Sequence, residues 1–208
     1  MIITAIEYGE GKKYKVYLND AFAFELYKSE IKSCGLETGQ ELEEELYEKI
    51  LYEVIGRRVK KRAMHILEKH DKTEQQLREK LREGRYPSES IESAIEYVKS
   101  YGYVDDISYA KRYVEYRIKK KSKKQLKMEL MGKGISSEII SQVLEEMDDF
   151  ELGTIKKLII KKCPFPTEIS SEEKNKLKMS LMRKGFPYSE IDRAFYQLED
   201  GEGILEIT

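Results

Sequence analysis

The hydrophobic pattern of this chain repeats three times between residues 73 and 198. The segments Thr73–Val98, Ser122–Met147 and Leu177–Leu198 align without a gap, in steps of 49 and 51 residues. Their shared apolar columns are Leu77/Leu126/Leu177, Leu81/Leu130/Leu181, Ile91/Ile140/Ile191, Ala94/Val143/Ala194 and Val98/Met147/Leu198. Self-similarity at a fixed period is typical of stacked units, each too small to bury its own apolar face alone. The pattern therefore predicts a helical repeat protein.

Each aligned segment carries the signals of a helix pair. Thr73 with Gln76, and Ser122 with Gln125, have the spacing of a capping box, in which side chain and backbone satisfy each other at a helix start. Glycines that fit the left-handed end of the first helix follow, at Gly134 and Gly185, and at Gly84, which is displaced by one position. At the start of the second helix the aligned residues are Pro87, Ser136 and Pro187.

A further helix precedes each pair, so each repeat is predicted to hold three helices. These first helices are expected at about Lys60–Lys69, Ile107–Lys121 and Leu152–Lys162. In the third repeat, Cys163–Pro166 interrupts the chain before Ser170 restarts a helix, which predicts an ordered kink or an exposed loop. The predicted repeats span residues 57–104, 105–149 and 150–199, followed by an acidic tail at 200–208 that frays from Glu199.

Residues 1–28 have a different pattern. Apolar residues alternate with polar ones in three short segments, separated by turns at Gly9–Gly11 and Asn19–Asp20. This pattern predicts a three-stranded antiparallel meander. Helices expected at Ser29–Ser33 and about Gln40–Gly56 would cover its apolar face, so residues 1–56 form a predicted N-terminal extension.

Composition limits the classes of protein that the chain can belong to. The 208 residues are 40% hydrophobic, which suffices for one extended or two compact domains, and 38 basic against 39 acidic residues give a net charge of −1. Cys34 and Cys163 are far apart and form no CxxC pair, which predicts a reducing interior rather than a disulfide or metal scaffold. Because no signal-like start or long apolar run is visible, we expect a soluble cytoplasmic protein.

Positive charge is concentrated in the middle repeat. From Ala110 to Gly134, ten basic residues stand against Glu115 and Glu129, a balance of +8. The first helices of the other repeats are also basic, at Arg57–Arg62 and at Lys156–Lys162. Because equivalent positions in a stacked array fall along one face, this pattern predicts a basic stripe that matches a polyanion or a nucleoprotein. The alternative interpretation is a solvated face with lysines at helix C-termini.

Other patterns give little sign of chemistry. His65 and His70 are five residues apart and do not share a helix face as metal ligands would. Asp105–Asp106 could belong to a metal-dependent nuclease, but a helix cap near Ile107 explains the pair more simply. There is no Walker loop, no GxGxxG and no nucleophile with an evident base, so no catalytic residue, metal or cofactor is predicted.

Five tyrosines lie around the join of the first two repeats. They are Tyr101, Tyr103, Tyr109, Tyr113 and Tyr116. Stacking on nucleic-acid bases is one interpretation of such a cluster. Their helical spacing favours core packing for most of them.

From Lys60 to Met147 the chain resembles the RecX regulators of the RecA recombinase. The most specific segment is Gly102-Tyr103-Val104-Asp105-Asp106 followed by Tyr109-Ala110, and Arg117, Leu126 and Gly134-Ile135 continue the likeness. The third repeat resembles the family more faintly, and residues 1–28 are similar to an extension of longer members. Lys69–Asp71 and Ser122 depart from the family pattern, at positions where each fits a turn or a cap.

The resemblance implies a mainly α fold, with tandem three-helix repeats stacked in an elongated crescent beside the small N-terminal β meander and helices. It also implies a regulator that binds the RecA–single-stranded DNA filament and restrains its extension, ATPase and strand exchange, and so recombination and the SOS response. We expect this capture to need no catalysis, and we expect a monomer because an end-capped stack gives no reason to need a partner copy. Single- or double-stranded DNA is a further expected partner, and a membrane is not. The candidate contact residues are basic: Arg57, Arg58, Lys61, Lys111, Arg112, Arg117, Lys119, Lys120, Lys123, Lys124 and Lys127. A free-standing DNA-binding module or transcription regulator is the alternative function, and whether the protein inhibits or remodels the filament stays open.

Overall fold

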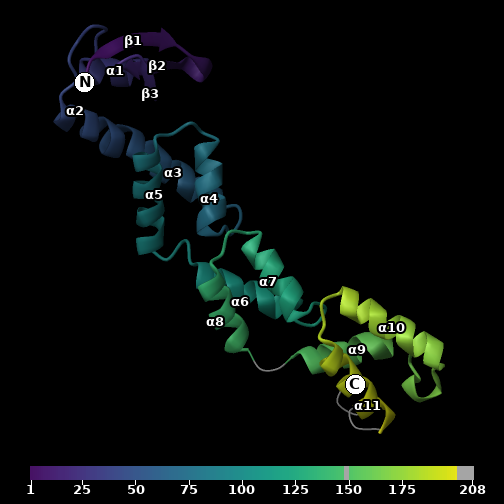
Figure 1. Ribbon diagram of the computed structural model, residues 1–208. Helices are drawn as coiled ribbons and strands as arrows, with labels where there is room; N and C mark the ends of the chain where they lie inside the picture. The colour runs from purple at the N-terminus through teal and green to yellow at the C-terminus, as the bar shows by residue number, and fades with distance from the viewer. Residues whose placement is uncertain (148–149, 201–208) are drawn as a thin grey trace. The chain divides into compact units, whose positions relative to one another are not determined.

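A three-stranded sheet followed by a series of helices makes up the chain in the computed structural model, which describes residues 1–147 and 150–200 (Figure 1). The strands are β1 (Ile3–Tyr8), β2 (Lys13–Leu18) and β3 (Ala21–Tyr27). The helices are α1 (Lys28–Cys34), α2 (Glu44–Lys49), α3 (Gly56–Leu67), α4 (Glu74–Arg82), α5 (Ser88–Ser100), α6 (Asp106–Arg117), α7 (Lys123–Met131), α8 (Ser137–Glu145), α9 (Glu151–Lys162), α10 (Ser171–Arg183) and α11 (Tyr188–Glu199). The predicted fold class, mainly α with a small N-terminal meander, is confirmed.

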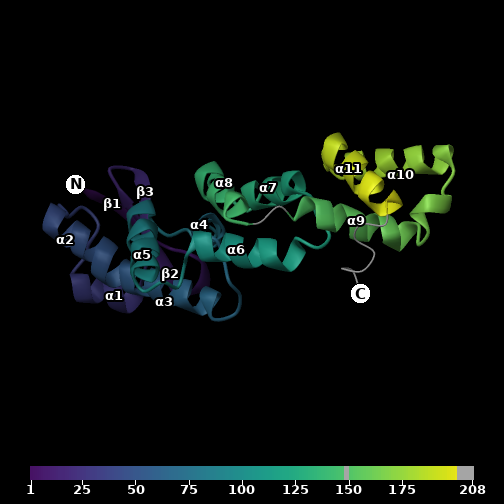
Figure 2. The same cartoon turned by 90° about the horizontal axis from the view of Figure 1, so that it is seen from below.

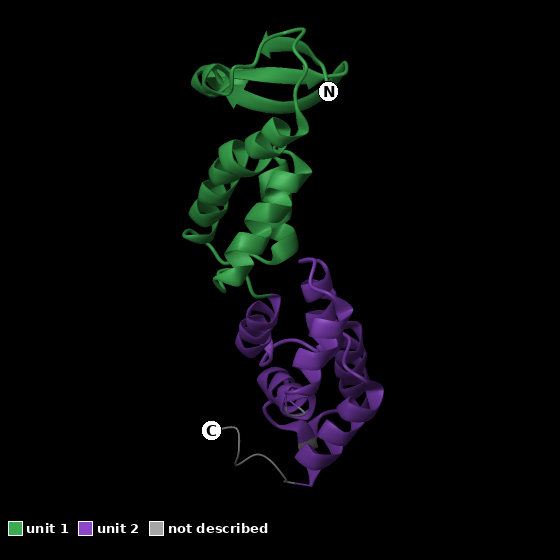
Figure 3. Cartoon of the chain, turned by 90° about the vertical axis from the view of Figure 1, so that its left-hand side faces the viewer, with its two compact units in different colours: residues 1–105 green, residues 106–208 purple. Residues whose placement is uncertain are grey.

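The helices and the sheet are divided between two compact units. Unit 1 ends at Asp105 and holds the sheet and the first repeat, whereas unit 2 begins at Asp106 and holds the second and third repeats (Figure 3). Within the described part of the chain, no helix combines the length and the apolar character needed to cross a membrane.

The sheet is an antiparallel meander in the order β1-β2-β3, as predicted. Its two-residue turn places Asn19 and Asp20 at positive φ, which these residue types tolerate better than most. Alternation along the strands buries one face, including Ile3, Val16 and Phe24, each fully inaccessible to solvent. This face needs a cover, which the rest of unit 1 provides.

Sheet and first repeat share a single hydrophobic core. The same cluster contains Phe24 of the sheet, Ile55 before α3 and Leu77 of α4. The buried hydroxyl of Ser90 on α5 donates a hydrogen bond of 2.7 Å to the carbonyl of Leu51. The predicted boundary between residues 56 and 57 therefore lies inside one continuous core.

The predicted break between a helix at Gln40–Gly56 and another at Lys60–Lys69 was wrong. The chain is helical from Glu44 to Leu67, through a π-helical segment at Ile50–Ile55 (Figure 2). Gly56 keeps a right-handed helical conformation with φ of −55°, so it does not act as a terminator. The basic residues that follow are good helix formers, and the run continues through them.

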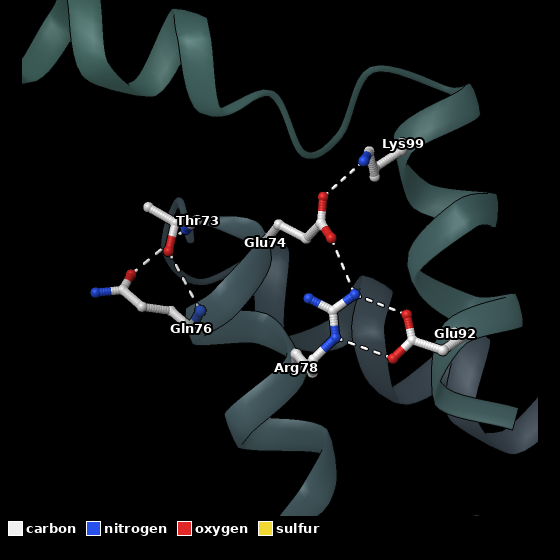
Figure 4. Close-up of polar contacts among 6 residues, drawn as sticks. All are labelled: Thr73, Glu74, Gln76, Arg78, Glu92 and Lys99. Atoms are coloured by element: carbon white, nitrogen blue, oxygen red, sulfur yellow. Dashed lines mark hydrogen bonds and ion pairs between the residues drawn. The ribbon is translucent and has the colours of Figure 1, made fainter. Parts of the chain in front are cut away.

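The helix ends of the first repeat differ from the prediction in one residue. Thr73 and Gln76 form the predicted capping box at α4 (Figure 4). The left-handed residue after α4 is Arg85, with φ of 55°, and not Gly84. A Cβ on Gly84 would lie 2.5 Å from the Tyr86 ring, so that glycine provides space rather than a turn conformation.

Unit 2 contains two repeats, each with its own core cluster. The predicted capping box at Ser122 is confirmed, Ser136 caps α8, and Gly134 and Gly185 have φ of 80° and 83°. The expected first helix at Ile107–Lys121 ends early, at Arg117, because residues 118–120 turn towards Ser122. In the third repeat, α11 packs along α9 and α10 (Figure 2).

Two expectations for exposed positions need correction. Tyr101, Tyr103 and Tyr116 are 63%, 54% and 84% exposed rather than core residues, although Tyr109 and Tyr113 are half-buried. Glu199 does not begin a frayed tail, because it ends α11. The remainder of the predicted tail, residues 201–208, lies outside the described residues.

Candidate nucleoprotein interface

The turn between α6 and α7 is the centre of the basic region in the middle repeat. Arg117 ends α6, and its carbonyl accepts a hydrogen bond of 3.0 Å from the Lys120 amide. Lys119 and Lys120 lie exposed in this turn, and Ser122 then caps α7. The local sequence thus places lysines on a short connection between two helix ends.

Hydrogen bonds to the third repeat hold both ends of this turn. The hydroxyl of Thr154 on α9 donates to the Ile118 carbonyl at 2.8 Å, before the lysines. After them, the buried Ser122 hydroxyl donates to the Lys184 carbonyl at 2.8 Å, while accepting from the Gln125 amide at 3.2 Å. We call these contacts the repeat 2–3 joint. Because both flanks are fixed, the turn lies in a defined place on unit 2.

Glu151 adds a third contact to the repeat 2–3 joint. Its carboxylate, which is almost fully buried, accepts a hydrogen bond of 2.8 Å from the backbone amide of Lys123 in the first turn of α7. A carboxylate at a helix N-terminus is stabilised by the free amides and by the helix dipole. The Glu151 carboxylate therefore holds the lysine-rich start of α7 through the backbone amide of Lys123, and not through a lysine side chain.

Some of the predicted contact residues already interact within unit 2. Lys111 forms an ion pair of 2.6 Å with Glu146. The Arg117 guanidinium lies 4.6 Å from the centre of the Tyr113 ring, and Lys123 lies 5.6 Å from that of Phe150. Arg112 is exposed on α6. Lys111, Arg117 and Lys123 therefore make contacts within unit 2 as well as adding positive charge.

Glu129 neutralises part of this region from inside the repeat. It pairs with Lys121 and accepts a hydrogen bond of 2.8 Å from the Tyr113 hydroxyl. Burial and this hydrogen bond raise the pKa of Tyr113 to about 12. Burial also acts to raise the pKa of Glu129, but hydrogen bonds from Lys121 and Tyr113 outweigh it and hold that pKa below its usual value. Lys121 is therefore engaged with a charged carboxylate.

Four lysines of the middle repeat remain exposed and, among the described residues, form no ion pair. They are Lys119, Lys120, Lys124 and Lys127. We call this set the open lysines. The stem of Lys124 passes over Gly185 of the third repeat, close enough that a Cβ on Gly185 would lie 3.3 Å from the lysine Cβ.

Comparison of aligned positions explains why Lys127 is open. Its counterpart in the first repeat, Arg78, forms two hydrogen bonds with Glu92, of 2.9 and 2.7 Å, and a third with Glu74 (Figure 4). The counterpart in the third repeat, Lys178, pairs with Asp192. At the position aligned with these two acids the middle repeat has Ser141. The middle repeat therefore lacks the acid that neutralises this cation elsewhere.

The electrostatics of the flanking repeats agree with this difference. A hydrogen bond from Arg78 holds the pKa of Glu92 below its usual value, and one from Lys178 does the same for Asp192. Glu74 has a lowered pKa because it accepts hydrogen bonds from Lys99 and from Arg78. Each flanking repeat thus neutralises this cation with an acid of its own.

The three candidates in the first repeat have different surroundings. Arg57 is exposed, with Glu53 at 3.9 Å, and Lys61 is also exposed. The Arg58 side chain is only 19% exposed. It donates a hydrogen bond of 2.8 Å to the Glu25 carbonyl of β3 and lies over the Tyr27 ring. Arg58 therefore binds the sheet to α3, and we leave it out of the surface proposed below.

Sequence reasoning missed two features of this region. One is the closed ion pair of the flanking repeats, which a column-by-column comparison of Arg78/Lys127/Lys178 with Glu92/Ser141/Asp192 would have indicated. The other is a third capping box, formed by Ser170 and Glu173 at α10. Its S-x-x-E spacing was visible, but the proline-containing interruption before it disturbed the alignment.

The other predicted features add no site. Among the described residues, no group of three or more His, Cys, Asp and Glu is placed to hold a metal ion. His65 is exposed beside Glu68. Cys163 is a free, half-buried thiol at the start of the proline-containing interruption, in which Pro164 is exposed and Pro166 is buried. It lines a hollow of about 480 Å³ with Phe165 and Ile169. The lining of that hollow mixes Lys162 and Lys176 with Glu168 and Glu173.

Comparison with known proteins assigns the repeats to one family. Models described as the first, second and third three-helix domains of RecX match residues 60–97, 105–144 and 149–195. A protein named Regulatory protein RecX from Clostridium acetobutylicum is 30% identical over 207 residues, which cover 94% of this chain and 95% of that protein. The chain belongs to the RecX family.

Other relatives of this RecX protein extend the likeness over nearly the whole chain. A Regulatory protein RecX from Caldanaerobacter subterraneus subsp. tengcongensis is 31% identical, over 93% of this chain and 98% of that one. A crystal structure of regulatory protein RecX has a TM-score of 0.61 at 25% identity, covering 97% and 99% of the two chains. RecX from Lactobacillus salivarius has a TM-score of 0.63 at 26% identity and covers 70% of this chain.

Proposed function

We propose that this RecX protein is a non-enzymatic regulator that binds the RecA–single-stranded DNA filament through the open lysines, and that it inhibits or modulates filament extension, ATPase and strand exchange. The family membership supports the regulatory role. The observation that supports the site is the absence, at Ser141, of the acid that closes the equivalent ion pair in the flanking repeats. The mechanism is steric and electrostatic capture.

The charge and exposure of the open lysines fit such a target. Lysines without an ion-pair partner in the described part of the chain have a positive charge that is left uncompensated for an external anion, and an exposed cation loses little hydration before contact. A nucleoprotein filament offers phosphates and acidic side chains at regular intervals. Exposed Arg57 and Lys61, together with Arg112, Arg117, Lys111 and Lys123, contribute longer-range attraction that raises the association rate.

The first experiment measures the DNA-dependent ATPase of RecA as this protein is added below stoichiometry. Because capture of an assembled filament affects many subunits at once, we expect inhibition at a small fraction of the RecA concentration. An unchanged ATPase, together with strong binding to bare DNA, would contradict the proposal and favour the free-standing DNA-binding module. Bare-DNA affinity would then fall on the order of a thousandfold between about 50 and 200 mM salt if ~6 phosphates were neutralised.

The second experiment tests the open lysines as a set. Replacing Lys119, Lys120, Lys124 and Lys127 with glutamine is expected to raise the concentration for half-inhibition by on the order of tenfold or more. The matched control replaces four exposed lysines of unit 1 for which the described residues provide no ion-pair partner, which are Lys12, Lys28, Lys32 and Lys49. Equal effects of the two quadruple variants would show that only total charge matters, and would remove the site from the proposal.

The third experiment closes the ion pair without altering any lysine. Ser141→Asp gives the middle repeat the Lys–Asp pair that the third repeat has at Lys178 and Asp192. We expect several-fold weaker inhibition, and a salt dependence of binding reduced by about one ion. Ser141→Asn has nearly the same shape but no charge, and it is expected to leave inhibition unchanged. If both variants behave alike, Lys127 makes no contact of the kind proposed.

A further inference from the structure

Unit 1 carries a cluster of exposed aromatic rings that has no role in its core. Tyr97, Tyr101 and Tyr103 are 38%, 63% and 54% exposed. The ring centres of Tyr97 and Tyr101 lie 5.0 Å apart, and those of Tyr101 and Tyr103 lie 6.1 Å apart at an interplanar angle of 24°. We call these residues the tyrosine ladder. Its rings pack on one another rather than into the apolar interior.

The backbone at the end of α5 fixes the last ring of the ladder. The Tyr103 amide donates to the Val98 carbonyl at 2.9 Å, and Gly102 is left-handed with φ of 70°. This is a Schellman motif, in which the residue after the glycine normally makes a hydrophobic contact with the helix it ends. The ladder is therefore held by hydrogen bonds that do not depend on burial of the tyrosine rings.

Two other helix ends of this protein show how unusual Tyr103 is. After α7 and α10 the same backbone pattern places Ile135 and Phe186 next to the left-handed glycines, and both side chains are 3% exposed. Tyr103 occupies the equivalent place after α5, yet more than half of its surface is open to solvent. Packing does not account for an aromatic ring at this position, which points to a ligand.

Lys60 lies beside the ladder, on a helix that carries further cations. The Lys60 ammonium is 5.2 Å from the centre of the Tyr97 ring, and Arg57 and Lys61 are exposed on the same helix, α3. From Gly56 to Leu67 this helix contains no acidic residue. A ligand that fits both features has π faces for the rings and negative charge for the cations. Single-stranded nucleic acid has both, because its bases stack on aromatic side chains while its phosphates follow basic residues.

We propose that the tyrosine ladder is a base-stacking site for single-stranded nucleic acid, with Tyr101 and Tyr103 taking the bases and Lys60 and Arg57 contacting the phosphates. A protein partner is the other class of ligand that aromatic surfaces take, but it would not require the acid-free basic helix alongside. The site lies in unit 1, and it does not rest on the open lysines of unit 2 or on recombinase binding.

The test separates bases from phosphates. Fluorescence anisotropy measures binding of the full-length protein to a labelled thymidine oligonucleotide and to an abasic oligonucleotide with the same number of phosphates. The wild-type protein is expected to bind the thymidine strand more tightly. Tyr101→Ala/Tyr103→Ala is expected to lose on the order of tenfold in affinity for the thymidine strand, as one to two stacked bases imply, with no change for the abasic strand.

Two control variants protect this result from a folding artefact. Tyr101→Phe/Tyr103→Phe keeps both rings and is expected to bind as the wild type does. Tyr52→Ala removes a ring of unit 1 that is 45% exposed but lies outside the ladder, and it is expected to have no effect. Equal wild-type affinity for the two strands would overturn the proposal. So would a Tyr101→Ala/Tyr103→Ala variant that weakens RecA inhibition without altering strand affinity, because the ladder would then bind protein.

Discussion

Arg85 has a backbone conformation that suits glycine better. Its φ of 55° lies in the left-handed region, where a side chain on an L-residue costs about 1–2 kcal/mol. The second and third repeats have Gly134 and Gly185 at the aligned position, with φ of 80° and 83°. The first repeat therefore contains a strained residue where its neighbours do not.

Arg85→Gly is accordingly expected to stabilise unit 1. The strain that is relieved exceeds the extra chain entropy of glycine, so the expected gain in the free energy of unfolding is about 0.5–1 kcal/mol. Urea denaturation of the variant and the wild type measures it. Gly134→Arg, the reverse exchange in the second repeat, is expected to lose about 1–2 kcal/mol. A loss of stability in Arg85→Gly would mean that contacts of the arginine side chain outweigh the backbone strain.

Glu129 is expected to make the stability of unit 2 depend on acid pH. Because its pKa in the folded protein is below the usual value, the carboxylate favours the folded state at neutral pH. This contribution is present above the unfolded pKa of about 4.5 and is lost as the pH falls through the lower folded pKa. Glu129→Gln should therefore lower stability at pH 7 and reduce the loss between pH 7 and pH 3.5. Identical losses in both proteins, measured by urea unfolding at the two pH values, would contradict this assignment.

At the scale of elements, the repeat 2–3 joint depends on the absence of a side chain at Gly185. A Cβ there would lie 3.0 Å from the Ser122 hydroxyl, in a residue that already has φ of 83°. Gly102 also ends a helix with a positive φ of 70°, but a Cβ there would meet nothing within 4 Å. A side chain at Gly102 would therefore cause backbone strain alone, whereas one at Gly185 would cause backbone strain and steric crowding.

We expect Gly102→Ala to cost about 1 kcal/mol, through backbone strain alone, and Gly185→Ala to cost about 2–4 kcal/mol, because crowding adds to the strain. Thermal unfolding of both variants is the measurement. In Gly185→Ala the second and third repeats should also exchange amide hydrogens faster near Ser122. An equal loss of unfolding free energy in the two variants would show that the repeat 2–3 joint accommodates the added methyl group at no cost.

The sequence was sufficient to predict the elements whose signals are local. Capping boxes at Thr73 and Ser122 and the alternating strands depend on residues within a few positions of each other, and all were confirmed. The continuous helix through Gly56 was not predicted, because glycine terminates a helix or continues it according to packing by distant residues such as Ser90. The prediction that most of the five tyrosines belong to the core was wrong for the same reason, since helical spacing alone does not say which face of a helix is covered.

Part of the candidate site could also be predicted from the sequence. The concentration of lysines around Lys120 is a property of composition, whereas their division into open and engaged side chains depends on partners such as Glu129 and Glu146, which only the fold brings near. Arg58 shows the limit of a charge count. It belongs to the most basic run of the first repeat, yet it is bound to the sheet. Whether the open lysines contact a filament stays a prediction.

At the scale of the whole molecule, the common core of sheet and first repeat implies that residues 1–56 are not a detachable extension. Removing them would take Phe24 and Ile55 out of the core and expose Val59 and Ala63, all of which are fully buried. The loss of several such side chains, at about 1.5–3 kcal/mol each, exceeds the margin by which a small domain is stable.

A fragment of residues 57–208 is therefore expected to fold only in unit 2. Hydrogen exchange followed by mass spectrometry should find fast exchange throughout α4 and α5, and protection in α6 to α11. A fragment that starts at Asp106 is the control, and its unit 2 should be protected to the same degree. Protection of α4 and α5 in the longer fragment would show that the first repeat folds without the sheet.

The repeat 2–3 joint also bears on the entropy of binding. Residues 119–121 have little freedom left, because the chain is hydrogen-bonded at Ile118 before them and at Ser122 after them. Ordering the backbone of a flexible loop costs about 1–2 kcal/mol per residue. A ligand that binds this turn avoids most of that cost, because the turn is already ordered in the folded protein. Association at the turn should consequently weaken little on warming until unit 2 itself melts, since there is no loosely held loop to fray beforehand.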